Sequence, residues 1–91
     1  MNNEVRLIEI EVLSESINNV GNSLARYMTR NGISIKDSAN SLVVLYKKIA
    51  LLADWNKLEA MSDSELDGLR AHLRYLKEYI AVLPNATKKA A

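Results

Sequence analysis

The side chains that could carry out chemistry in this chain are few and isolated from one another. Histidine is the usual proton-transfer residue near neutral pH, and His72 is the only one present. A Glu-x-x-His metal motif would need an acid at position 69, where the chain has Leu69. Serines at 14, 16, 23 and 38 lie outside the strand–turn–helix setting that exposes a catalytic serine. These residues predict neither a catalytic unit nor a metal site.

The carboxylates and the missing residue types lead to the same expectation. Asp63 and Glu65 follow Ser62, and Ser-Asp-Ser-Glu is typical of a capping box at the start of a helix. The absence of cysteine excludes disulfides, cysteine-ligated metals and thiol nucleophiles. There is also no glycine-rich loop of the kind that binds phosphate groups. We therefore predict a protein that is not an enzyme and has no cofactor.

Length and hydropathy set the scale of the molecule. At 91 residues, one small domain is expected. The longest apolar runs are five residues, far short of the ~20 that span a bilayer. The first residues carry acids where a secretion signal would be basic. These features predict a soluble cytoplasmic protein that does not enter a membrane.

Three segments have apolar residues at the spacing of an amphipathic helix. The expected helices span about 3–30, 35–59 and 63–83, and Pro84 ends the last one. Short connections favour antiparallel neighbours, so we predict an all-α, up-down-up bundle of three long helices in a single domain, 1–84. A disordered basic tail is expected at 85–91. The first and third seams step by three and four residues as in a coiled coil, through Ile10, Leu13, Ile17, Val20, Leu24 and Tyr27, and through Leu66, Leu69, Leu73, Leu76, Ile80 and Leu83.

Each expected helix also has a second apolar stripe. Monomers seldom expose contiguous apolar patches above a few hundred Å², so this surplus predicts a dimer or higher oligomer, a protein partner, or both. The function that fits best is a non-enzymatic interaction protein: an adaptor, an assembly factor or an inhibitor of a larger machine. Its compact helical composition is typical of phage and mobile-element proteins. The predicted interface residues are Val5, Ile8, Val12, Val44, Leu51, Trp55, Leu58, Tyr75 and Tyr79.

Charge is sorted along the chain, and this sorting leaves an alternative function open. In the expected bundle the acids of the first residues and of 54–67 meet at one pole, and bases gather at the other. A basic pole with nearby tyrosines is suited to phosphates and stacked bases. The alternative prediction is therefore a regulator that binds nucleic acid or a nucleotide, through Arg26, Arg30, Lys36, Arg74 and Lys77.

Overall fold

The computed structural model describes residues 3–84, and all regular secondary structure in that range is helical. Four helices follow one another: α1 (Asn3–Arg30), α2 (Ser41–Leu52), α3 (Trp55–Ala60) and α4 (Asp63–Ala81). The all-helical class is confirmed for this part of the chain. The tail predicted at 85–91 lies outside the described residues.

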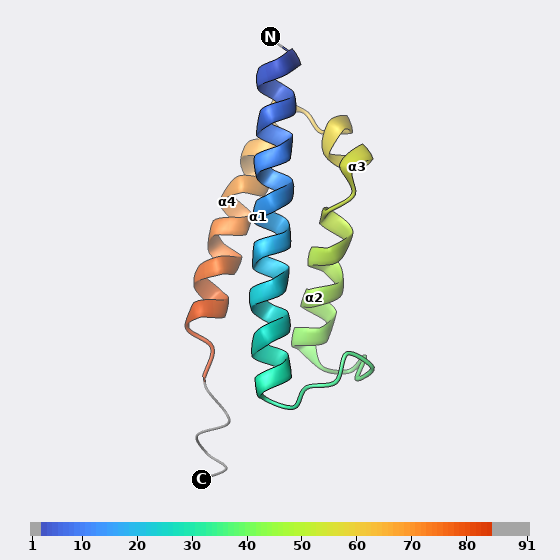
Figure 1. The fold of residues 1–91 in the computed structure, drawn as a ribbon, viewed down its shortest axis with the longest axis vertical. Coiled ribbons are helices and arrows are strands. Elements are labelled where there is room, and N and C mark those ends of the chain that lie inside the picture. The colour runs from blue at the N-terminus through green and yellow to red at the C-terminus, as the bar shows by residue number, and fades with distance from the viewer. Residues whose placement is uncertain (1–2, 85–91) are drawn as a thin grey trace.

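The long helix α1 lies in the middle of the molecule. α2 and α3 lie along one side of it and α4 lies along the other (Figure 1). Both neighbours pack against the apolar seam of α1, whose residues from Ile10 to Leu24 are almost fully buried. The core is completed from the other helices by Val43, Ile49, Leu58, Leu66, Leu69, Leu73 and Leu76.

Three contacts fix α4 beside α1. Near the start of both helices, Arg6 Nη1 donates to Asp63 Oδ1 at 2.7 Å. Farther along, Arg70 Nη2 lies 3.3 Å from Glu9 Oε2. At the other end the Tyr27 hydroxyl donates to the Pro84 carbonyl oxygen. Because both partners advance together along the chain, α1 and α4 run in the same direction.

The single helix expected over 35–59 is not present, and that prediction is wrong. Gly32 adopts φ +67°, the left-handed conformation that ends a helix, and a looped segment continues to Asn40. Asn40 caps α2 by accepting from the Leu42 N–H at 2.8 Å. Asp54 then interrupts the helix and caps α3 by accepting from the Asn56 N–H. Short Asn and Asp side chains compete with the helical ladder for backbone groups, so each starts a new helix here.

The start of α4 has the capping box that its sequence predicts. The Ser62 hydroxyl accepts from the Glu65 N–H at 3.2 Å, and Glu65 Oε1 accepts from the Ser62 N–H at 3.0 Å. The hydrogen bond from the Ser62 backbone, followed by the one from its side chain, holds the pKa of Glu65 below its usual value. α4 therefore begins at a fixed point, which sets the register of every side chain that it presents.

Candidate protein-interaction surfaces

The first third of α1 presents four apolar side chains to solvent, and the three most exposed of them are Val5, Ile8 and Val12. Val5, Ile8 and Val12 are 56%, 61% and 56% exposed. Their spacing of three and four residues places them on one face of the helix, away from the seam that packs into the core. We call these three residues the α1 ridge. Glu11 and Glu15 are exposed nearby on the same stretch of helix.

A second exposed apolar group lies on α2 and at the start of α3. Val44 and Leu51 are two turns apart on α2, and Trp55 is the first residue of α3. We call these three residues the α2 face. Leu58 was predicted to join them, but it is fully buried, at 0% exposure. The break at Asp54 turns α3 relative to α2, so the extrapolated stripe does not continue and Leu58 enters the core.

The exposed aromatic residues of α4 form a stacked row. The rings of His72 and Tyr75 lie 6.5 Å apart at 17°, and those of Tyr75 and Tyr79 lie 6.4 Å apart at 16°. Both tyrosines remain accessible, Tyr75 the more so. Offset stacking of this kind is favourable and holds the rings along the helix surface, where a partner can contact them.

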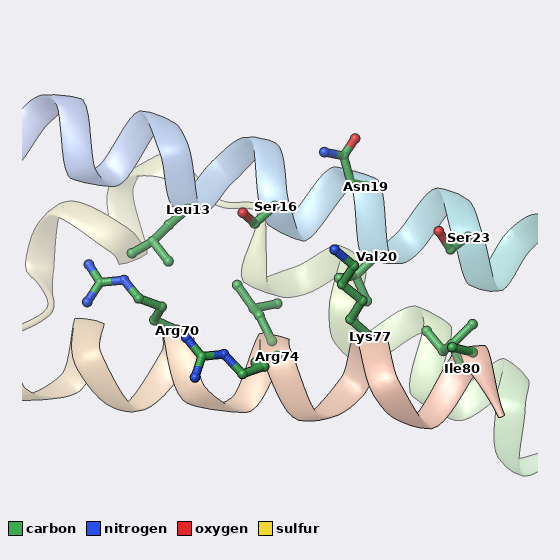
Figure 2. A pocket seen from close by; sticks show the side chains of 11 residues that line it. Leu13, Ser16, Asn19, Val20, Ser23, Arg70, Arg74, Lys77 and Ile80 are labelled. Atoms are coloured by element: carbon green, nitrogen blue, oxygen red, sulfur yellow. The ribbon is translucent and has the colours of Figure 1, made fainter.

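A groove of about 470 Å³ runs between α1 and α4 (Figure 2). Its floor is apolar and comes from the core, with Leu13 and Val20 from α1 and Leu73 and Ile80 from α4. The two walls differ chemically. On the α1 side they are uncharged, with Ser16, Asn19 and Ser23, and on the α4 side they are cationic, with Arg70, Arg74 and Lys77. The groove thus combines an apolar floor with one row of positive charge.

The structure distributes the five predicted basic-pole residues over three places. Arg74 and Lys77 line the groove. Arg26 and Arg30 lie on the last two turns of α1 and border a separate shallow hollow. Lys36 is exposed in the segment between α1 and α2. Tyr27, which lies near Arg26 and Arg30 on α1, donates its hydroxyl hydrogen bond to the Pro84 carbonyl oxygen.

Arg6 makes structural contacts that the charge pattern of the sequence did not predict. It is the lone base in an acidic stretch, so its sequence context suggests only an exposed charge. In the structure its guanidinium joins α1 to the corner between α3 and α4, through Asp63 and the carbonyl oxygens of Glu59 and Met61. The forked geometry of a guanidinium suits several acceptors at once. Only the fold reveals that these acceptors lie beside residue 6.

No helix within residues 3–84 has the length and hydropathy to cross a membrane. Within the same range, no three His, Asp or Glu side chains gather as a metal-binding group. The exposed apolar groups of this part of the chain include the α1 ridge, the α2 face and the aromatic row.

Comparison with known proteins gives one result. Residues 4–83 match the model of a family described as bacterial epsilon antitoxin. No match was found among curated proteins or among solved structures. Because the family match runs from the second residue of α1 to beyond the end of α4, the chain belongs to the bacterial epsilon antitoxin family.

Proposed function

We propose that this chain binds a toxin protein and inhibits it by occupying its surface, with the α1 ridge as the main contact. Membership of an antitoxin family supports a protein partner and an inhibitory, non-catalytic role. The observation that carries the choice of surface is the exposure of Val5, Ile8 and Val12, each more than half accessible on a helix whose other face is core. The site of action that we propose is the bacterial cytoplasm.

The energy available from this ridge is large enough to matter for binding. Burying a Val or Ile side chain completely contributes about 1.5–3 kcal/mol. Since more than half of each ridge side chain is still exposed, covering all three contributes about 3–4 kcal/mol. That corresponds to a factor of roughly 100–1,000 in the dissociation constant. The acids Glu11 and Glu15 beside the ridge favour a toxin surface that is apolar at its centre and basic at its rim.

The test replaces the ridge by residues of similar helix propensity. The triple variant Val5→Ser, Ile8→Ser, Val12→Ser should keep the helix, because serine and the β-branched residues rank close together in propensity. Binding to the toxin is measured by calorimetry, and neutralisation is measured as growth of cells that express the toxin. We expect affinity to fall by roughly 100-fold or more, with loss of neutralisation.

The matched control is the variant Val44→Ser, Leu51→Ser, which removes exposed apolar side chains from α2 instead. It should bind the toxin as the unmodified chain does. If the ridge variant, with its helical circular dichroism intact, still neutralises, then the α1 ridge is not the contact. Equal loss in both variants would also count against a contact centred on α1.

The α2 face supports a second part of the proposal, which is assembly of the chain into a dimer or higher oligomer. Its residues Val44, Leu51 and Trp55 are 40%, 64% and 38% exposed, so a second copy of the chain can contact them. Sedimentation of the unmodified chain should give a multiple of 10.2 kDa. The Val44→Ser, Leu51→Ser variant should sediment as a smaller species, and a monomeric unmodified chain would rule this part out.

A further inference from the structure

We infer that the groove between α1 and α4 is a second docking site, and that it takes an acidic amphipathic helix from a protein partner. This inference does not depend on the α1 ridge. The ridge lies before residue 13, whereas the groove is lined by α1 residues from Leu13 onward. The groove is therefore available to a different segment of a partner.

The charge of the groove selects an acidic occupant. Three cations line its α4 wall, and the described residues that line the groove include no acid. Arg70 is already paired, with Asp67 at 2.8 Å and with Glu9 at 3.3 Å. Arg74 and Lys77 make no ion pair within residues 3–84. Two positive charges thus lie beside an apolar floor without an ion-pair partner within residues 3–84, and carboxylates of a partner would supply one.

The shape of the groove selects a helix over a phosphate ligand. From Leu13 to Ser23 the α1 side extends about 15 Å, which is about three turns of helix. Arg70, Arg74 and Lys77 follow at spacings of four and three residues, so they form a row one helical turn apart (Figure 2). A partner helix with acids at the same spacing can face this row while its apolar stripe covers the floor. A nucleic-acid backbone would use the cations but would gain nothing from the apolar part of the groove, where Ile80 is only partly buried.

The test measures binding of a labelled synthetic peptide to the full chain by fluorescence anisotropy. The peptide is an amphipathic helix of about four turns, with glutamates one turn apart beside a leucine stripe. A second peptide carries glutamine in place of glutamate, and a labelled DNA duplex serves as a third probe. We expect the glutamate peptide to bind at least about tenfold more tightly than the glutamine peptide, with an affinity that falls as salt rises.

Two kinds of variant locate the binding. The double variant Arg74→Glu, Lys77→Glu reverses the two unpaired positive charges on the exposed side of α4. It should weaken binding of the glutamate peptide about tenfold or more. Lys47→Glu with Lys48→Glu makes the same change in net charge on α2, away from the groove, and should leave binding unchanged. Ser16→Trp fills the groove without altering charge and should also abolish binding. Helix content by circular dichroism is checked for each variant.

The outcomes separate this inference from the proposed function. Equal binding of the two peptides, equal effects of the two charge reversals, or no peptide binding at all would overturn the inference. Tighter binding of the duplex, lost in Arg74→Glu with Lys77→Glu, would overturn it in favour of nucleic acid. The Val5→Ser, Ile8→Ser, Val12→Ser variant should still bind the glutamate peptide. The proposed role of the ridge is therefore tested by toxin binding, and the proposed role of the groove is tested separately by peptide binding.

Discussion

Replacing Arg6 by methionine tests whether one guanidinium ties α1 to the corner between α3 and α4. Methionine keeps the unbranched stem and a similar helix propensity, so the change removes mainly the polar contacts. The pair with Asp63 is short, at 2.7 Å, but the Asp63 side chain is 59% exposed, so the pair contributes less than about 1 kcal/mol. The contact with the Met61 carbonyl is partly buried and adds about 1–1.5 kcal/mol. The bond to Glu59 is longer, at 3.3 Å, and adds little.

The expected loss in the free energy of unfolding is therefore about 2 kcal/mol. For a domain of this size, it lowers the midpoint of thermal unfolding by roughly 8–16 °C. Urea unfolding followed by circular dichroism measures the free energy directly. Hydrogen exchange should show that the first turns of α1, which include the α1 ridge, lose protection more than its later turns do.

The control is Arg26→Met, because among the described residues Arg26 donates only to Ser23 Oγ, at 3.4 Å. Its effect on the free energy of unfolding should stay within about 0.5 kcal/mol. Arg6→Lys should lie between the two, since an ammonium keeps the charge near Asp63 but lacks the fork that reaches the carbonyls. If Arg6→Met and Arg26→Met change stability equally, the assignment of Arg6 as the link between α1 and the α3–α4 corner is refuted.

Two further predictions concern backbone and pH. Gly21→Ala should raise the free energy of unfolding by about 0.5–1 kcal/mol, because alanine favours the helix and its Cβ would meet Ile49 Cγ2 at an ordinary 3.5 Å. Gly32→Ala should lower the free energy of unfolding by about 1 kcal/mol, because φ is +67° at that position. If both glycine variants shift the midpoint of thermal unfolding in the same direction, this pair of predictions is contradicted. The pKa of Glu65 is lowered in the folded chain, so its ionised carboxylate stabilises the fold. This stabilisation is present at a pH above the usual carboxyl pKa and is lost as the pH falls through the folded pKa. The stability advantage of the unmodified chain over Glu65→Gln should therefore shrink on acidification, and an advantage independent of pH would contradict the capping role.

Local signals in the sequence predicted where a helix starts. The capping box at Ser62 and Glu65 depends only on neighbouring backbone, so it appears in the structure where the sequence predicts it. The interruption of the expected helix at Asp54 could not be predicted in this way. An aspartate on a predicted helix can sit on its polar face or interrupt it, and the choice depends on whether Leu58 gains more by entering the core. Predicted interface residues before Asp54, such as Ile8 and Leu51, are exposed, whereas Leu58, which follows it, is fully buried.

Short-range patterns in the sequence predicted the helical class and the residue at which α4 begins, because both depend on residues within a few positions of one another. The roles of residues that are far apart in the chain follow from the packing of the helices. This packing brought Arg6 to Asp63, placed Arg74 and Lys77 on a groove with Leu13, and separated Arg26 and Arg30 into another hollow. These juxtapositions depend on how α4 packs along α1, and that packing is set by the summed burial of both seams rather than by any local signal.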